Sequence, residues 1–286
     1  GASDGKIAAY LWSDGKLHAA WSKHVGDHVC ALTTVSGYVA AAIGHEVHTY
    51  AMEPHALTFR RPWDCAFVSS CLASQGSTLV VGDAMHSLTV LTVAEDGRLS
   101  ESARDLHPYW TSAVCVLDEE QQRYLGTDVA MNLFVAERAK GTEPENPWSH
   151  VMRHAAACHV GDLVNAIHTL PGGRVMYATA SGALGTLVHV PEPVARVLLC
   201  VQDAMIEVVP APGDIPWESW RTSRTDTRTE PPHHILDADV LRFFVSDPSV
   251  RSPCLDKAGS LAQARDIPMA EMAEERILQM LHALLS

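Results

Sequence analysis

Basic residues are scarce in this sequence, and no run of lysines or arginines occurs in it. The 286-residue chain holds 21 Lys and Arg against 34 Asp and Glu, so its formal net charge is −13. An acidic surface repels phosphate backbones, and a chain without a basic run lacks the local patch that binding to them needs. Direct binding of DNA or RNA is therefore disfavoured, and we expect contact with nucleic acid only indirectly, through partners.

The chain also lacks paired cysteines and long apolar runs. Its seven cysteines include no CxxC pair and their number is odd, which argues against a disulfide framework and favours a reducing compartment. The longest uncharged stretches, Val29–His45 and Val175–Pro191, are interrupted by Gly and Ser. Neither reaches the roughly 20 consecutive apolar residues of a membrane span. We expect no membrane partner.

The first two thirds of the chain show the pattern of short strands separated by turns. Runs rich in β-branched, aromatic and small residues alternate with Gly, Asp, Ser or Pro, as in antiparallel β proteins. The clearest predicted strands are Lys6–Trp12, Leu17–Ser22, Val29–Val35, Tyr38–Ile43 and Glu46–Met52. The Asp-Gly pair at 14–15 predicts a hairpin between the first two, because Gly adopts positive φ without steric cost.

An internal repeat is the most informative feature. Four segments (41–50, 79–91, 123–135 and 175–188) each combine an apolar strand that ends in a small residue, a tight turn and a second strand. Their marker residues are Gly44, Gly82, Gly126 and Ala178. The markers recur at roughly 40–50 residues, which is the period of four-stranded β-propeller blades. We therefore predict a mainly β fold, a partial β-propeller of about four to five blades over residues 1–190.

The beginning of the chain fits the same repeat. Gly5–Trp12 is similar to the second half of one further copy. A closed ring usually needs more than four and a half blades, and the first residue is Gly1 rather than Met. We therefore expect a fragment that lacks the early blades of its propeller.

Beyond residue 190 the pattern becomes helical. Pro191–Pro193 interrupts the strands, and Val194–Val209 carries apolar residues at helical spacing, as an amphipathic helix does. Pro268–Leu285 predicts a second amphipathic helix, with acidic residues in its first turns where they suit the helix dipole. Residues 191–286 are predicted to form a small α-helical C-terminal domain.

The middle of this helical domain is less regular in sequence. Pro210–His234 is rich in Pro, Thr and Arg, which predicts an irregular connection. Asp237 or Asp239 is expected to cap a helix that runs through Phe244, because an Asp side chain accepts the free N–H groups of a first turn.

No set of catalytic residues stands out. His-Glu-Val-His at 45–48 is one residue short of the zinc-protease signature and lies on a predicted strand turn, where the required helical spacing is absent. The pairs His24/His28 and His150/His154 lie in strand-like surroundings without a third ligand, which favours surface or edge histidines. No Walker loop, Rossmann glycine pattern or nucleophile elbow is present. We predict no enzymatic activity, no metal site and no cofactor.

Several motifs, in order along the chain, resemble one family of propeller scaffolds. They are Val-Gly-Asp-Ala-Met-His-Ser (81–87), Ala-Arg-Asp-Leu-His-Pro-Tyr-Trp-Thr-Ser-Ala-Val (103–114), Asn-Leu-Phe-Val (132–135), His-Val-Gly-Asp-Leu-Val-Asn (159–165) and Thr-Glu-Pro-Pro-His-His-Ile-Leu-Asp-Ala-Asp-Val-Leu (229–241). They resemble the C-terminal region of the family of the UV-damaged DNA-binding protein large subunit. This family also includes the large subunit of the cleavage and polyadenylation factor and a splicing-factor propeller subunit. The resemblance runs from about Ser3 to beyond Phe244.

The resemblance implies a scaffold of three propellers followed by helices, of which this chain is similar to the last propeller and the helices. Such a scaffold is the adaptor of a cullin–RING ubiquitin ligase in DNA-damage repair, found in the nucleus and cytoplasm. One propeller, absent here, would bind the cullin, and a cleft would receive WD40-type substrate receptors. Two segments, 228–231 and 104–110, favour this adaptor. The alternative is a nucleic-acid-binding propeller subunit of a pre-mRNA cleavage, polyadenylation or splicing complex.

The resemblance also implies partner-binding residues on the receptor-docking face. These are Arg104, Trp110, Asn165, His86, Leu163 and Ala180. Trp and Arg suit this role because they are the commonest interface anchors. Three residues depart from the family pattern: His86 stands in place of an arginine, and Cys30 and Cys71 in place of tyrosines. We therefore expect a different set of partners or weaker docking.

Three of these residues have an alternative, purely structural role. Trp110 could be a wedge packed between blades, and Arg104 could cap a strand end through the adjacent Asp105. Asn165 could satisfy a turn. The exposure of each side chain and its hydrogen-bond partners distinguish these roles.

Overall fold

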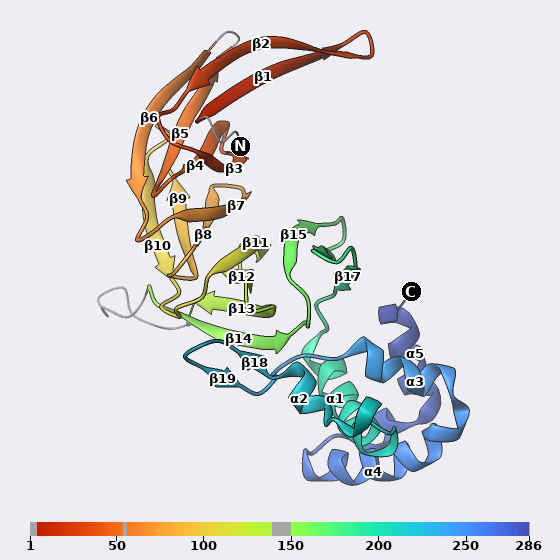
Figure 1. Cartoon of the computed structure of the whole chain (residues 1–286). Coiled ribbons are helices and arrows are strands. Elements are labelled where there is room, and N and C mark those ends of the chain that lie inside the picture. The colour runs from red at the N-terminus through yellow and green to blue at the C-terminus, as the bar shows by residue number, and fades with distance from the viewer. Residues whose placement is uncertain (1–4, 54–55, 139–149, 286) are drawn as a thin grey trace.

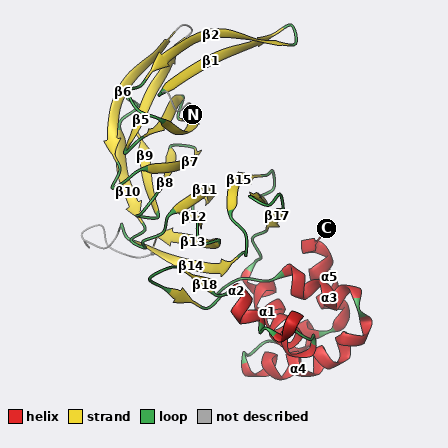
Figure 2. Ribbon diagram, viewed as in Figure 1, coloured by secondary structure: helices red, strands yellow, loops and turns green. Residues whose placement is uncertain are grey.

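A computed structural model of the chain describes residues 5–53, 56–138 and 150–285. A row of antiparallel sheets is followed by a group of helices (Figures 1 and 2). The first sheet is a hairpin of β1 (Lys6–Ser13) and β2 (Lys16–His24). Three sheets then have four strands each, in the sequential order of a meander.

The strands of these sheets follow the chain without crossovers. The first four-stranded sheet holds β3 (Val29–Val35), β4 (Tyr38–Ile43), β5 (Glu46–Glu53) and β6 (Ala56–Asp64). The second holds β7 (Ser69–Gln75), β8 (Thr78–Asp83), β9 (Leu88–Val93) and β10 (Leu99–Arg104). The third holds β11 (Thr111–Asp118), β12 (Arg123–Asp128), β13 (Asn132–Arg138) and β14 (Met152–His159). A three-stranded sheet of β15 (Val164–Thr169), β16 (Val175–Thr179) and β17 (Leu184–Leu187) comes last.

The sheets are arranged radially around an arc. Figure 1 shows the first strands β3, β7, β11 and β15 on the inner side and the last strands β6, β10 and β14 on the outer side. The four inner strands line a shared hollow of about 520 Å³. Apolar side chains between successive sheets form the core, so that each sheet buries its neighbour. This is a partial β-propeller, as the repeat predicts.

The repeat markers occupy one place in every sheet. Gly44 directly follows β4, while Gly82, Gly126 and Ala178 lie near the ends of β8, β12 and β16. All four strands are the second of their sheet. Gly5 precedes β1 as Gly44 precedes β5, so β1 and β2 take the place of the third and fourth strands of a blade. The sequence repeat is therefore the blade repeat.

A β-bulge recurs near the start of the innermost strand of each sheet. The pairing register shifts by one residue at Cys30, Ser70, Ser112 and Asn165. A bulge bends the strand, strengthens its twist and re-aims a side chain. Because the bulge has the same position in all four sheets, the chain passes from each preceding connection into the first strand in the same way.

The residues after β17 form helices around a separate core. The helices are α1 (Glu192–Val208), α2 (Trp217–Arg221), α3 (Ala238–Ser246), α4 (Arg251–Ala264) and α5 (Glu274–Leu285), with 3-10 turns at Pro212–Asp214, Pro248–Val250 and Met269–Met272. Buried side chains such as Leu198, Phe244 and Ile277 join α1, α3 and α5 in this core. In the part of the chain that the structure describes, no helix is both long and apolar enough to cross a bilayer.

Two expectations for this region are wrong. Pro268–Leu285 is not one helix, because Ala273 is extended (φ −63°, ψ 135°) and separates a 3-10 turn from α5. The break lets Met272 and Ile277 both reach the core. Residues 210–234 are not simply irregular either, since they contain α2 and a short hairpin of β18 (Ser223–Arg224) and β19 (Thr229–Glu230).

The segment around this hairpin joins the helices to the propeller. His233 and Ala157 of β14 exchange two backbone hydrogen bonds of 3.1 and 3.2 Å. Asn132 of β13 bonds to Arg224 of β18 through both amide atoms, at 3.0 and 3.2 Å. Main-chain pairing of this kind fixes the orientation of the segment relative to the third four-stranded sheet.

Candidate docking face

The loops at one edge of the propeller form a continuous surface. In an antiparallel meander, the turn between the second and third strands lies at the same edge as the connection to the next sheet. We call this edge the connection face. It consists of the turns 44–45, 84–87, 129–131 and 180–183 and the connections 25–28, 65–68, 105–110 and 160–163.

Backbone hydrogen bonds join the loops of the connection face in series. Each turn is bonded to the connection beside it, so the series crosses from sheet to sheet. The pairs are Cys65 N with His45 O, Ala84 N with Val68 O, Ser87 N with Tyr109 O, Val129 N with Trp110 O, Val160 N with Met131 O and Ala180 N with Leu163 O, at 2.8–3.0 Å. Loops tied in this way present their side chains on a rigid frame.

Buried carboxylates hold two of the turns. The side chain of Asp83 accepts the backbone N–H groups of Met85 and Phe67, each at 2.8 Å. Asp128 accepts both the N–H and the side-chain amide of Asn132, at 2.9 Å. Burial raises the pKa of Asp128, and these hydrogen bonds oppose that effect. Asp83 and Asp128, the last residues of β8 and β12, thus hold the turns that follow these strands.

Five of the six predicted partner-binding residues lie on or beside neighbouring loops of this face. His86 and Trp110 come from adjacent loops and are exposed, and Leu163 is half-buried. Ala180 is exposed next to Leu163. Asn165, just after the connection 160–163, is the bulged residue of β15 and is exposed. The structure places these residues in a row across three sheets.

The structure also distinguishes the alternative roles. Trp110 is 57% exposed, so it is not a wedge packed between blades. Arg104, the sixth residue, ends β10 and donates to Glu101 at 2.6 Å rather than pairing with Asp105. Its Nε is buried without a partner among the described residues. Arg104 therefore lies at the margin of the connection face, where β10 ends and the connection 105–110 begins.

Sequence reasoning missed the apolar character of this face. Several large hydrophobic side chains on its loops are exposed to solvent. They are Phe67, Met85, Leu106, Trp110, Val129 and Met131. These residues come from successive loops at one edge of the propeller, and exposed large apolar groups gathered on one face are a mark of an interaction site. The sequence holds these residues as single apolar positions within polar turns, and a search for periodic patterns does not detect single positions.

Asp105 is the buried polar centre behind Trp110. Its carboxylate accepts hydrogen bonds from Ser87 (2.6 Å), His107 (2.5 Å) and His154 (2.9 Å). Burial opposes ionisation, but the bonds from the two histidines outweigh it and hold the pKa of Asp105 well below its usual range. His154 belongs to β14, and its side chain is only 4% exposed. His154 thus lies on the edge strand of its sheet, as one of the two expectations had it, but its side chain is not at the surface.

The serine, threonine and cysteine side chains of the described residues do not pair with histidines. A hydrogen bond of this kind to a histidine is the pairing that activates a nucleophile. Burial raises the pKa of the Cys71 and Cys115 thiols to about 12. Thiols with such a pKa stay protonated and unreactive at neutral pH.

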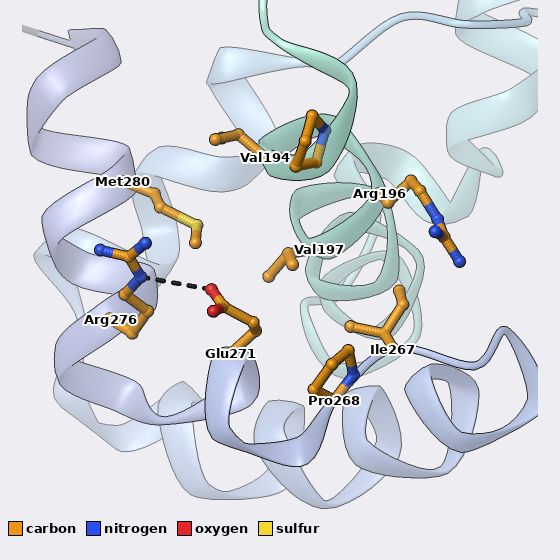
Figure 3. Close-up of a pocket in the computed structure, with 9 residues that line it drawn as sticks. Val194, Arg196, Val197, Ile267, Pro268, Glu271, Arg276 and Met280 are labelled. Carbon is orange, nitrogen blue, oxygen red and sulfur yellow. Dashed lines mark hydrogen bonds and ion pairs between the residues drawn. The ribbon is translucent and has the colours of Figure 1, made fainter.

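A second hollow lies in the helical part. It has a volume of about 260 Å³ between α1 and α5, and Figure 3 shows Val197 and Met280 among its apolar walls. Arg276 Nε pairs with Glu271 at 3.2 Å beside it, and Arg196 donates to a backbone carbonyl. The charged groups beside this hollow, Arg276, Glu271 and Arg196, thus already have hydrogen-bond partners within the protein.

Most of the chain, including the connection face, is matched by one sequence family. The sequence profile of the CPSF A subunit region matches residues 2–246. The chain belongs to the CPSF A subunit region family. The match covers the propeller sheets and the helices up to α3. The connection face is therefore a feature of the part of the chain that the family shares.

Within this family, the chain is similar to DNA damage-binding proteins. It is 27% identical to DNA damage-binding protein 1a of Arabidopsis thaliana over 260 residues, which cover 84% of this chain and 24% of that protein. DNA damage-binding protein 1 of Solanum lycopersicum is 27% identical over 90% of the chain and 25% of its own length. DNA damage-binding protein 1 of Drosophila melanogaster is 27% identical over 84% and 22%. The chain thus spans about a quarter of the length of these relatives.

Proposed function

We propose that this chain is a non-enzymatic docking scaffold that acts in a DNA-damage pathway. The observation that carries the proposal is the row of exposed apolar side chains on the connection face, around Trp110. Surface groups of this kind are desolvated when a partner binds, and large aromatic residues give most of the binding energy. The relatives' names connect the family to damaged DNA.

The proposed partners are WD40-type substrate receptors. They would bind the connection face, with Trp110 as the central anchor and His86, Leu163, Asn165 and Ala180 around it. Arg104 would contribute at the edge. Because His86 lies on the neighbouring turn and Leu106 on the same connection as Trp110, a partner that covers Trp110 would also reach them. Exposed apolar side chains on loops that are hydrogen-bonded to one another suit a folded receptor.

The remainder of the proposed role extends beyond the residues of this chain. A cullin–RING ligase would be contacted through a propeller outside this sequence. Contact with DNA would be indirect, since the net charge of −13 opposes binding to phosphate backbones. A role in DNA-damage repair also implies work in the nucleus, with a cytoplasmic pool.

A second function is supported by the description of the family. The CPSF A subunit region gives its name to the profile match, which favours an RNA-processing subunit as the alternative. Such a subunit would sit in a pre-mRNA cleavage, polyadenylation or splicing complex. The similarity to three DNA damage-binding proteins weighs toward the damage pathway.

Affinity purification of the full-length protein tests both functions at once. We expect WD40-type receptors and a cullin to be recovered, and Arg104→Ala/Trp110→Ala to remove the receptors while the cullin remains. Trp12→Ala is the matched control, since Trp12 is 70% exposed at the tip of the β1–β2 hairpin. Recovery of polyadenylation or splicing subunits in place of a cullin would decide for the alternative.

A further inference from the structure

Two histidines and an aspartate converge behind the connection face. Nδ1 of His107 lies 2.5 Å from one carboxylate oxygen of Asp105, and Nε2 of His154 lies 2.9 Å from the other. The two imidazole rings stack with their centroids 3.9 Å apart. One potential ligand atom from each residue falls within 4.8 Å of the others. Three donor groups from two sheets thus face one small volume.

The surroundings of this cluster are those of a cation site. The Asp105 side chain is fully buried, and among the described residues no Lys or Arg forms an ion pair with it. A buried carboxylate without a fixed countercharge is costly unless hydrogen bonds or a cation compensate it. In the structure, hydrogen bonds from the two imidazoles and the Ser87 hydroxyl do so.

We propose that Asp105, His107 and His154 bind one zinc ion that ties two neighbouring sheets together. Imidazole nitrogens and a carboxylate oxygen are ligands that Zn²⁺ prefers, and a water molecule would complete a tetrahedron. Bonds of about 2.0–2.1 Å place tetrahedral donor atoms about 3.3 Å apart. Zinc binding would therefore require the carboxylate to move away from the two nitrogens, now 2.5 and 2.9 Å from it, and the stacked rings to turn toward one ion.

The outer contacts of the cluster act on this role in opposite directions. Nδ1 of His154 is buried without a partner among the described residues, and zinc binding through Nε2 would leave the ring proton there unpaired, a cost that the metal bond has to exceed. Ser87 Oγ, 2.6 Å from Asp105, would orient the carboxylate from outside. His107 is 22% exposed and opens the site to solvent. The ion has both an entry path and oriented ligands.

A zinc ion here would stiffen the connection face. His107 and Asp105 lie on the connection 105–110 that also carries Trp110, whereas His154 lies on β14 of the next sheet. The metal would add a bond between the two sheets directly behind the proposed anchor. Holding a hot-spot residue rigid lowers the entropy lost on binding.

The structure offers one contrasting cluster. His45, Glu46 and Asp64 also bring donor atoms within 4.8 Å, but His45 and Asp64 are exposed to solvent. Exposed carboxylates are hydrated, so they gain little from a cation. We assign no site there, and His45→Asn serves as a control.

Zinc binding to the full 286-residue chain tests the proposal. The measurements are equilibrium dialysis for stoichiometry, thermal stability against zinc concentration, and the visible spectrum with Co²⁺ in place of zinc. We expect one tightly bound equivalent, a rise in Tm with zinc, and a tetrahedral Co²⁺ spectrum without thiolate charge-transfer bands. His107→Asn keeps an amide nitrogen near Nδ1 but removes the ligand, and it should weaken binding at least ~100-fold, more than the loss of an outer contact.

Two matched control variants and one variant of an outer contact complete the experiment. His150→Asn and His45→Asn remove exposed histidines outside the cluster and should leave the affinity unchanged. Ser87→Ala should weaken it by about 10–100-fold, as the loss of an outer-shell partner does. Equal affinity of His107→Asn and His150→Asn overturns the proposal. An octahedral Co²⁺ spectrum of the unaltered chain also overturns the proposal, and this measurement does not depend on the folding of any variant.

Discussion

The Nε atom of Arg221 lies 2.7 Å from a carboxylate oxygen of Asp237, and this ion pair joins α2 to the start of α3. The same oxygen accepts the indole N–H of Trp217 at 2.8 Å, while the other oxygen caps α3 through Asp239 N. Arg221 also reaches the carbonyl of His159 at the end of β14, at 3.4 Å. The Asp237 carboxylate thus caps the start of α3 and holds α2 through Trp217 and Arg221. Arg221 in turn contacts the end of β14.

Asp237→Asn should lower the free energy of unfolding by about 1.5–3 kcal/mol, the range for a hydrogen bond to a charged group. The amide cannot accept from Arg221, Trp217 and Asp239 together. Urea unfolding followed by circular dichroism measures the change. Asp239→Asn is the control, since this exposed carboxylate lies 3.7 Å from Arg221 and should contribute less than about 1 kcal/mol. Equal effects of the two variants would refute the role of Asp237.

The stability of the protein should fall in acid partly because of the same residue. Burial tends to raise the pKa of Asp237, but hydrogen bonds from Arg221 and Trp217 lower it below the usual value. A depressed pKa in the folded state stabilises the protein above the unfolded value of about 3.9, and the contribution is lost as pH falls through the folded pKa. The difference in unfolding free energy between wild type and Asp237→Asn should be constant from pH 7 to about 5 and shrink below about pH 4. A difference that grows in acid contradicts this.

Gly126→Ala should destabilise the third four-stranded sheet by about 1–3 kcal/mol, the range for overpacking a core. A Cβ at this position would lie 2.7 Å or less from two atoms of the Phe134 ring, which is fully buried beside Tyr109 and His154. Gly259→Ala is the matched control. Its Cβ would meet only the flexible end of Met269 at 3.3 Å, and alanine favours helix α4 by up to about 1 kcal/mol. We expect Gly126→Ala to lower Tm and Gly259→Ala to raise it. An unchanged Tm for Gly126→Ala would contradict the close packing of Phe134 against Gly126.

The chain should bind nucleic acid weakly by itself. With a net charge of −13, its Kd for damaged duplex DNA or single-stranded RNA should not fall below the nonspecific range of about 10⁻⁴–10⁻⁶ M at physiological salt. Fluorescence anisotropy against salt concentration measures this. Nanomolar binding with a steep salt dependence would instead support direct contact and favour the RNA-processing alternative.

The propeller was predictable because its blades repeat. Gly44, Gly82, Gly126 and Ala178 mark one strand end in four sheets, so their spacing alone indicates the architecture. Gly126 also shows the physical reason for a small residue there, since Phe134 fills the space beside it. The predicted strands therefore agree closely with β1 to β5.

The helical part was less predictable because its patterns are weak. Helix α4 was not predicted, since it buries small residues such as Cys254, Ala258 and Ala262 rather than a stripe of large ones. The break at Ala273 lies in a sequence of good helix formers and is set by the packing of Met272. Tertiary contacts decided both features.

The site was predictable only in part. Trp110 and His86 were found through the resemblance, and the structure places them on neighbouring loops. The partnership of Asp105 with His154 joins residues 49 positions apart, and no local pattern indicates it. The division of the chain into a propeller domain and a helical domain near residue 190 stays a prediction.

The affinity of a WD40-type receptor for the Trp110→Ala variant tests the central claim most directly. Biolayer interferometry should show a Kd about 30-fold weaker than for the unaltered protein, the equivalent of a hot-spot loss of about 2 kcal/mol. Trp12→Ala should bind as the unaltered protein does. Equal affinity of all three proteins would show that the receptor does not use the connection face.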